Sequence, residues 1–343
     1  MSTLVYNTIK ASVVGKMKGT KYVIYVITIA MLLLNLTLIT SAIQITQESK
    51  ANGYIVVDKG KNGDYTSIQQ AIDNAESGSK IYVKKGEYTE VVFVDKSIRL
   101  FGEDKKSTLI NPISEKNKYA ICLGAHNIKI ENFTVINRAP GLYSTAIKVT
   151  RSNTEINNCL IQNTPVGIAI WTSENIVKNC DFRECEDEGI AFLGWKNSDC
   201  KNNKVLNCTF TENCDGIELQ YSSDNIIRDC NFYRNSHTGI DAIASSNNNN
   251  KIIGCIIKNN RVNGIYFSSS SDNEIIDCDV SDNIDGNIVT NKYSKNNQII
   301  YTNQDETEDE NKESVRDIIQ IILQKFEKLK SSRLQQILSS INF

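Results

Sequence analysis

A unit centred on a cysteine recurs about every 24 residues between residues 154 and 290. All units but the first have the form Asn-x-[Ile/Val]-x-x-Cys-x-[Phe/Ile/Val], and the first has threonine in place of this asparagine. A glycine follows eight or nine residues after each cysteine, in most units with isoleucine next. The cysteines at the shared position are Cys159, Cys180, Cys208, Cys230, Cys255 and Cys278. Repetition at a near-constant period of this length is typical of solenoids, in which each unit packs only against its neighbours.

Apolar residues flank each cysteine with the spacing of β-strands. In the unit around Cys180, Val177 lies three residues before the cysteine and Phe182 two residues after it, whereas Asn179 is polar. Period-two alternation points the cysteine and its apolar flanks into a core. A second short strand follows each repeated glycine, and no helical pattern separates the strands. The sequence therefore predicts an all-β fold, a right-handed parallel β-helix (solenoid) over residues 54–304.

The repeated cysteines and asparagines are predicted to form ladders along the solenoid. Equivalent side chains on neighbouring parallel strands lie about 4.8 Å apart and run side by side, which disfavours disulfides within the cysteine ladder. We therefore expect these cysteines to pack as small buried hydrophobic groups. The cysteines off the ladder are Cys122, Cys185, Cys200 and Cys214, and one disulfide among them stays open. The asparagine five residues before most cysteines suits a turn, because asparagine tolerates left-handed backbone and bonds neighbouring amides.

The N-terminal region has the pattern of a membrane-targeting segment. Four lysines and no acidic residue occur in residues 1–21, and an uncharged apolar stretch follows within residues 22–46. Such a stretch is long enough to cross a bilayer, and the positive flank predicts a cytoplasmic tail with the rest of the chain outside. Small residues at positions 40–42 also fit a signal-peptide cleavage site. We expect either a membrane-anchored protein with an N-terminal transmembrane helix, facing outside, or a secreted protein.

Helical patterns occur at both ends of the predicted solenoid. A capping box at Thr66 and Gln69 predicts a helix over residues 66–76 that covers the first coil. After the last coil, an acidic linker over residues 305–313 leads to a C-terminal amphipathic helix over residues 314–343. The sequence leaves three roles open for this helix: it folds back over the last coil, mediates self-association or contacts a membrane surface.

Several segments resemble known β-helix families. Residues 64–72, 86–90 and 98–102 are similar to the opening coils of pectinesterase-like proteins. The later units resemble pectate-lyase-like proteins and the copper-processing protein of nitrous-oxide reductase. This resemblance implies the fold, but it implies no activity, because one β-helix hosts lyases, hydrolases, esterases and binding proteins. The catalytic motifs of polygalacturonases, mannuronan epimerases and pectinesterases have no clear counterpart in the chain.

Acidic residues recur beside the repeated glycines of the middle coils. Two residues after each glycine, the predicted outward positions are Ala169, Ala191, Glu218, Asp241 and Tyr266. Glu188 and Asp215 immediately precede glycines, and His237 lies two residues before another. Because Glu218 and Asp241 fall on adjacent coils, their carboxylates are expected to lie side by side. Such a pair suits glycoside hydrolysis, with one carboxyl as acid and the other as base or nucleophile.

Aromatic side chains complete the predicted site. Trp171, Trp195, Tyr221 and Tyr266 lie near the carboxylates in the coil frame and offer flat apolar faces for sugar rings. The linear ladder of cysteines supplies no converging metal ligands, so the sequence predicts no metal site. No cofactor is certain, and calcium that links a uronate to the carboxylates stays open.

The sequence predicts an extracytoplasmic protein that binds polysaccharide or a cell-surface glycan through the outward acidic residues. A structural or adhesive surface protein without ligand chemistry is one alternative. A polysaccharide lyase or glycoside hydrolase acting on a uronate-containing glycan is another, and Arg234 or Lys196 is then the candidate base. The net charge of −2 provides no field that would attract nucleic acid.

Overall fold

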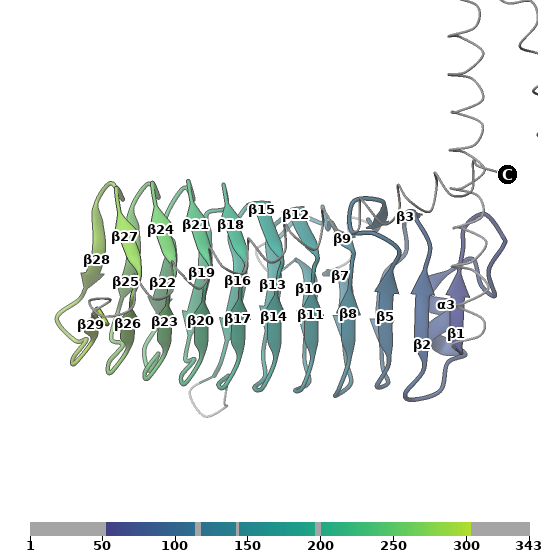
Figure 1. The fold of residues 1–343 in the computed structure, drawn as a ribbon, viewed down its shortest axis with the longest axis horizontal. Helices are drawn as coiled ribbons and strands as arrows, with labels where there is room; N and C mark the ends of the chain where they lie inside the picture. The colour runs from purple at the N-terminus through teal and green to yellow at the C-terminus, as the bar shows by residue number, and fades with distance from the viewer. Residues whose placement is uncertain (1–52, 114–117, 142–143, 196–199, 303–343) are drawn as a thin grey trace, which may run out of the picture.

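The computed structural model describes residues 53–113, 118–141, 144–195 and 200–302. Figure 1 shows short strands stacked side by side into one elongated solenoid that runs from the purple first coil to the yellow-green last coil. Every strand pairs in parallel with the equivalent strand of the neighbouring coil, from β1 and β2 at one end to β26 and β29 at the other. The predicted parallel β-helix is therefore confirmed.

Three parallel sheets form the walls of the solenoid, and we call them sheets A, B and C. Sheet A contains β1 (Tyr54–Val57), β2 (Lys80–Val83), β5 (Arg99–Gly102), β8 (Lys129–Glu131), β11 (Glu155–Asn157), β14 (Ile176–Lys178), β17 (Lys204–Leu206), β20 (Ile226–Arg228), β23 (Lys251–Ile253), β26 (Glu274–Ile276) and β29 (Gln298–Ile300). Sheet B contains β3 (Gly86–Tyr88), β6 (Thr108–Ile110), β9 (Thr134–Val135), β12 (Leu160–Thr164), β15 (Asp181–Cys185), β18 (Thr209–Thr211), β21 (Asn231–Tyr233), β24 (Ile256–Lys258) and β27 (Asp279–Ser281). Sheet C contains β4 (Val92–Val94), β7 (Tyr119–Leu123), β10 (Thr145–Val149), β13 (Val166–Ile170), β16 (Glu188–Leu193), β19 (Asp215–Gln220), β22 (Ile240–Ile243), β25 (Asn263–Phe267) and β28 (Gly286–Thr290).

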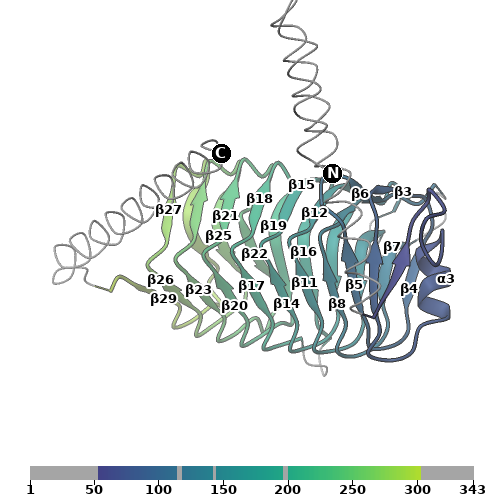
Figure 2. The ribbon, with the colours of Figure 1, turned by 45° about the vertical axis from the view of Figure 1, so that its right-hand side comes forward.

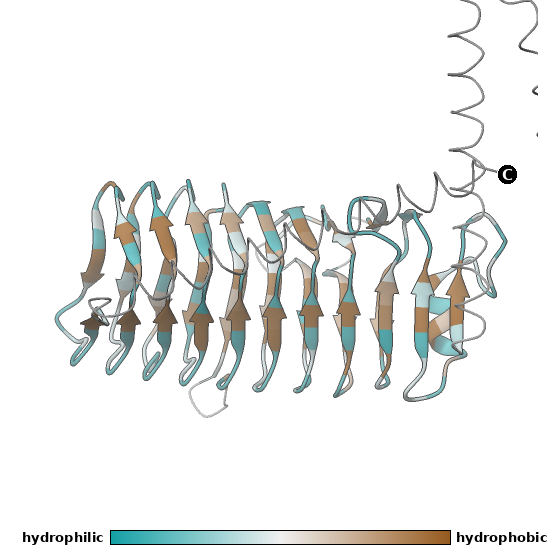
Figure 3. Cartoon of the chain, in the orientation of Figure 1, coloured by the Kyte–Doolittle hydropathy of each residue, from teal (hydrophilic) through white to brown (hydrophobic). Residues whose placement is uncertain are grey.

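The core lies inside the solenoid and is built from rows of identical or similar residues. Figure 3 shows hydrophobic segments recurring on successive strands along the stack. In sheet B, Phe182, Phe210 and Phe232 are fully buried, and their rings stack in parallel with 4.7 Å between consecutive centroids. This spacing is that of neighbouring strands, so the repeat length of the sequence directly sets the aromatic stack.

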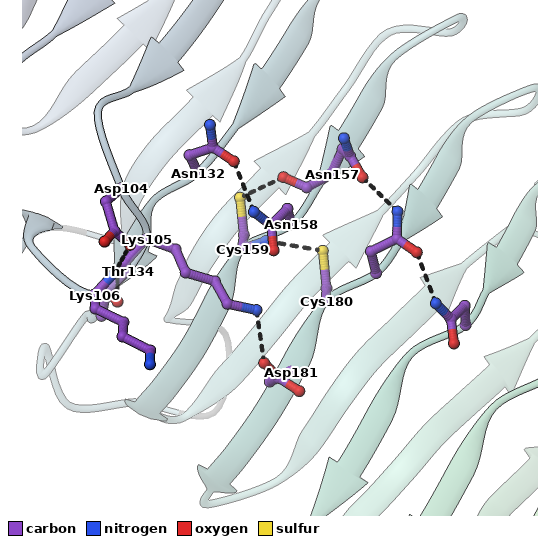
Figure 4. A network of polar contacts seen from close by, with 12 residues as sticks. Asp104, Lys105, Lys106, Asn132, Thr134, Asn157, Asn158, Cys159, Cys180 and Asp181 are labelled. Carbon is purple, nitrogen blue, oxygen red and sulfur yellow. Dashed lines mark hydrogen bonds and ion pairs between the residues drawn. The ribbon is translucent and has the colours of Figure 1, made fainter. Parts of the chain in front are cut away.

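The cysteine ladder lies in this core, and its sulfur atoms accept hydrogen bonds from the backbone. The amide of Cys159 donates to Sγ of Cys180 at 3.4 Å, and the amide of Cys208 makes the same contact with Cys230 (Figure 4 shows the first pair). All ten cysteines of the chain are free, and nine are buried. The ladder is therefore a packing device, as predicted, and the disulfide left open for the other four cysteines does not form.

Two asparagine ladders hold the corners of the coils. In each ladder, the side-chain oxygen of one asparagine accepts from both the backbone amide and the side-chain amide of the asparagine on the preceding coil. The first ladder, which was predicted, contains Asn175, Asn203, Asn225, Asn250, Asn273 and Asn297. The second ladder, which was not predicted, contains Asn213, Asn235, Asn260 and Asn283.

The left-handed backbone expected at the first asparagine ladder lies one residue earlier. Glu174, Asn202 and Asp224 have φ values of 64°, 57° and 59°, and each precedes a ladder asparagine. The ladder asparagine itself contributes its side chain, which bonds the next coil. The expectation that the ladder asparagine adopts this conformation was wrong, because the turn and the bonding side chain fall on consecutive residues.

A short helix, α3 (Ile68–Asp73), covers the first coil, as Figure 2 shows at the purple end of the solenoid. The helix buries Ile68, Ala71 and Ile72 against the solenoid, which confirms the predicted cap. The predicted capping box is wrong, because Ser67 is the N-cap residue. The carboxylate of Glu90, from the loop before β4, accepts from the amides of Ile68 and Gln69 at 2.8 and 3.0 Å.

The other predicted terminal elements lie outside the described residues. These are the basic tail 1–21, the apolar segment 22–46, the acidic linker 305–313 and the amphipathic helix 314–343. Within the described parts of residues 53–302, no helix is long and apolar enough to span a membrane. The transmembrane helix and the C-terminal helix therefore stay predictions.

Candidate functional site

The repeated glycines shape the corner at which sheet C begins. A Cβ atom on Gly216 would lie 2.5 Å from the carbonyl oxygen of Gly239 and 2.5 Å from a ring carbon of Phe232. Consecutive coils approach so closely at this corner that only glycine fits. The acidic residues that precede two of these glycines, Glu188 and Asp215, therefore stand at the edge of the corner, where sheet C meets the outside.

The outward face of sheet C carries the acidic residues in two rows. The first row pairs Ala169, Ala191, Glu218, Asp241 and Tyr266 in that order across β13, β16, β19, β22 and β25. The second row pairs Glu188 with Asp215. Glu218 and Asp241 are thus neighbours on adjacent strands, as the repeat predicted, and their role as a catalytic pair stays a prediction.

Five carboxyl groups gather on these coils, and we call Asp187, Glu188, Asp215, Glu218 and Asp241 the acidic cluster. Four of them are nearly as buried as the core: the exposed fractions are 6% for Glu188, 5% for Asp215, 8% for Glu218 and 4% for Asp241. A buried charge is costly unless a cation or hydrogen bonds compensate it. Among the described residues, His237 is the basic side chain that pairs with members of the cluster.

Burial and mutual repulsion shift the pKa values of the acidic cluster upward. Burial raises the pKa of Glu188, and the carboxylates of Glu218 and Asp187 raise it further. Burial also raises the pKa of Asp241 to about 7, and the carboxylate of Asp215 adds to this effect. The pKa of Glu218 is raised by burial, although hydrogen bonds from Gln220 and Glu188 oppose the shift. The raised pKa values of Glu188 and Asp241 favour their protonated forms, in which a carboxyl group donates a hydrogen bond as well as accepting one.

Asp215 is held in place by two hydrogen bonds from the turn before β22. Its Oδ1 atom lies 2.8 Å from Nδ1 of His237 and accepts from the backbone amide of Thr238 at 2.7 Å. Burial raises the pKa of Asp215, and the His237 ring and the Thr238 amide oppose the shift. Asp215 and His237 thus form one fixed unit beside Asp241, whose Oδ2 atom lies 3.8 Å from the same ring nitrogen.

A pocket of about 230 Å³ opens beside the acidic cluster on sheet C. Trp171, Ala169 and Ala191 form its apolar side, and Leu193 packs against the same small cluster. The polar side consists of Asp187, Glu188, Glu218 and Gln220. Nζ of Lys148 lies 4.8 Å from the centre of the Trp171 ring at the next coil. The pocket therefore presents an indole and several hydrogen-bonding groups to the same space.

The structure separates the predicted site residues into three groups. Glu188, Glu218 and Trp171 line the pocket. Asp215, His237 and Asp241 lie together on the adjoining coils, and Tyr266 is paired with Asp241 on β25. Trp195, which is 70% exposed, and Tyr221 are not among the residues that line the pocket. The candidate base Arg234 follows β21 of sheet B, and Lys196 lies outside the described residues.

Asp187 and Gln220 of the pocket, and Lys148 beside it, were not predicted. Asp187 directly precedes Glu188, and Gln220 lies two positions after Glu218. Both positions can therefore be counted from the repeated glycines. Lys148 lies on the coil before that of Ala169 and pairs with it, and on the coil of Lys148 the place of the repeated glycine is taken by Ala146. If the repeat of glycines is continued one coil toward the N-terminus and alanine is accepted in the glycine position, Lys148 is identified two residues after it.

The description "right handed beta helix region" belongs to a family model that matches residues 98–205, 120–280 and 205–309. These matches span most of the chain. The chain belongs to the right-handed β-helix family. The predicted handedness of the solenoid follows from this membership. No curated protein matches the chain in sequence.

Solved structures similar to this β-helix include proteins from phages and a plant. The chain is 16% identical to ORF18 of Geobacillus virus E2, with a TM-score of 0.54, covering 77% of this chain and 64% of that one. It is 14% identical to the enzymatically active domain of tailspike protein 2 from bacteriophage CBA120, with a TM-score of 0.47, covering 68% of this chain and 40% of that one. It is 14% identical to pectin methylesterase from carrot, with a TM-score of 0.43, covering 74% of this chain and 84% of that one. At this identity the likeness to ORF18 establishes the fold alone, and the chain spans less than two thirds of both phage proteins.

Proposed function

We propose that the chain binds a glycan in the pocket on sheet C. The observation that carries the proposal is the meeting of the Trp171 indole with the carboxyl groups of Glu188 and Glu218 in one pocket. Sugar rings present an apolar face and a rim of hydroxyl groups, so an indole and polar groups that both donate and accept match them. The pocket suits one sugar unit of a longer chain that lies across the coils.

The acidic cluster favours a neutral sugar or an amino sugar. A uronate carboxylate would enter a pocket lined by the three carboxyl groups of Asp187, Glu188 and Glu218, and it would be repelled by each of them that is ionised. A protonated amine or a hydroxyl group gains hydrogen bonds at the same place. The proposed ligand therefore differs from the uronate-containing glycan that the sequence left open.

Glycoside hydrolysis is a second candidate, favoured by the raised pKa of Asp241 beside Glu218. A carboxyl group with a pKa of about 7 is suited to donate a proton at neutral pH. Release of reducing ends from a neutral glycan by the native chain, and none by Glu218→Gln, is the result expected for a hydrolase. Binding without release of reducing ends is the result expected for a binding protein.

A glycan array with two matched tryptophan variants tests the binding proposal. Trp171→Ala is expected to weaken binding about tenfold, which corresponds to about 1.4 kcal/mol for loss of the stacking surface. Trp195→Ala serves as the control, because this indole is exposed and does not line the pocket. Absence of binding across neutral and amino glycans, or equal weakening by both variants, would contradict the proposal.

We also propose that this glycan lies outside the cytoplasm. The proposal is supported by the basic residues 1–21 and the apolar residues 22–46, which fit an anchor or a signal peptide. Degradation of the solenoid by protease added to intact cells, or its recovery from the medium, is the expected result. Protection in intact cells together with degradation after lysis would contradict it.

A further inference from the structure

Two aspartates and a histidine converge on the outward face of sheet C, next to the pocket. Asp215 begins β19, Asp241 lies in β22, and His237 belongs to the turn that leads into β22. One ligand atom from each of the three side chains lies within 4.8 Å of the other two. The three residues come from two adjacent coils, so the register of the solenoid brings them together.

The distances among these atoms fit a bound metal ion. Two ligand atoms about 2.1 Å from one ion lie about 3.0 Å apart in octahedral geometry and about 3.4 Å apart in tetrahedral geometry. Nδ1 of His237 is 2.8 Å from Oδ1 of Asp215 and 3.8 Å from Oδ2 of Asp241. These two distances bracket the ideal values, and the carboxylate atoms of Asp215 and Asp241 lie within 4.8 Å of each other.

An unpartnered oxygen provides independent evidence for a ligand at this place. Oδ1 of Asp241 is buried and has no hydrogen-bond partner, and the residue is only 4% exposed. Oγ1 of Thr238, a fully buried residue adjacent to His237, also lacks a partner. Buried polar atoms without partners are rare, and a bound ion with its water is one way to satisfy them.

The surroundings hold one of the three ligands in place and leave a route for an ion. The backbone amide of Thr238 donates to Asp215 at 2.7 Å, which fixes the carboxylate as outer hydrogen bonds do at metal sites. The side chain of His237 is 44% exposed, so solvent reaches one side of the site.

We propose that Asp215, His237 and Asp241 bind a divalent first-row transition metal ion such as Zn²⁺ or Mn²⁺. One imidazole nitrogen and two carboxylates are a ligand set that these ions accept, whereas Ca²⁺ takes oxygen ligands. Three protein ligands leave coordination positions for water or a bound molecule. The ion also supplies positive charge to an acidic cluster that has little compensation of its own. This inference does not depend on glycan binding.

Titration of the purified full chain with Co²⁺ and Zn²⁺ after removal of metal by a chelator tests the proposal. We expect one ion per chain by calorimetry and a visible absorption band from bound Co²⁺. Asp241→Asn keeps the shape of the side chain, and His237→Ala removes the nitrogen ligand. Each variant is expected to lose affinity by about 100-fold or more, because even the loss of an outer partner costs up to about 100-fold.

The control is His126→Ala, which removes the other histidine of the chain, in the turn between β7 and β8. This variant is expected to bind Co²⁺ as the native chain does, and circular dichroism checks that every variant retains its strands. Absence of Co²⁺ and Zn²⁺ binding at millimolar concentration would overturn the proposal. Equal affinities in the native chain and in both ligand variants would overturn it as well. Tighter binding of Ca²⁺ than of Zn²⁺ would exclude the histidine as a ligand and have the same consequence.

Discussion

Replacing Asn225 by alanine tests whether the asparagine ladders hold the coils together. The side chain of Asn225 is fully buried, and its oxygen accepts from the backbone amide and the side-chain amide of Asn203 at 2.9 and 3.1 Å. Its own amide donates to Asn250 at 3.1 Å and to the carbonyl of Cys200 at 3.3 Å. Asn225→Ala therefore removes four hydrogen bonds and leaves the buried backbone amide of Asn203 without an acceptor.

The expected cost is about 4–6 kcal/mol of unfolding free energy, because an orphaned buried amide costs about 1–3 kcal/mol and each of the three further lost bonds about 1 kcal/mol. Urea unfolding followed by circular dichroism measures this difference. Asn157→Ala is the matched control: its side chain bonds the side chains of Glu131 and Asn179 near solvent, and no backbone amide. We expect this control to cost less than about 1 kcal/mol. Equal costs for the two variants, or less than 1 kcal/mol for Asn225→Ala, would refute the reasoning.

Three further predictions follow from the corner, the acidic cluster and the thiols. Gly216→Ala is expected to lower the unfolding free energy by about 1–3 kcal/mol in urea unfolding, because the added Cβ would lie 2.5 Å from a carbonyl oxygen. An unchanged urea midpoint would contradict the prediction, because the neighbouring coils would then have moved to accommodate the methyl group. The raised pKa of Glu188 means that the folded chain keeps a proton that the unfolded chain releases, so this stabilisation is complete below pH 4.5 and declines as the pH rises toward the folded value. Between pH 5 and pH 8 the native chain should lose about 1.4 kcal/mol per pH unit more than Glu188→Gln, and parallel stability curves for the two proteins would contradict this. After unfolding, all ten cysteines should react with a thiol reagent. In the folded chain Cys214 should react first, but slowly, because burial raises its pKa to about 11. Reaction of a ladder cysteine before Cys214 would argue against the packing described.

The solenoid could be predicted because its core residues repeat in phase with its coils. The cysteine and the phenylalanine two residues later identify the interior of sheet B, and the glycine identifies the corner before sheet C. The second asparagine ladder was within reach, because Asn213, Asn235 and Asn260 each lie five residues after a ladder cysteine. The N-terminal cap was predicted only in part, since the carboxylate of Glu90 that caps α3 comes from a distant loop.

The rows of the candidate site could be predicted, but the pocket could not. Register alone places Glu218 beside Asp241, because both positions are counted from a repeated glycine. The two tryptophans looked equivalent in the coil frame, yet only Trp171 lines the pocket. Trp195 lies in the longer unit between Cys180 and Cys208, where additional residues interrupt the repeat. Counting from the repeated cysteine and glycine therefore does not predict where its side chain lies. Burial of the acidic cluster depends on the depth of the surrounding side chains, which no repeat pattern encodes.

The parallel cysteine ladder has a consequence for the environments in which the fold can persist. Neighbouring thiols of the ladder are separated by the spacing of the coils and engage backbone groups instead of one another. Formation of the solenoid thus consumes no oxidising equivalents, and a reductant has no cross-link to cleave. The cysteine-rich core of the solenoid therefore needs no oxidising environment to form or to persist.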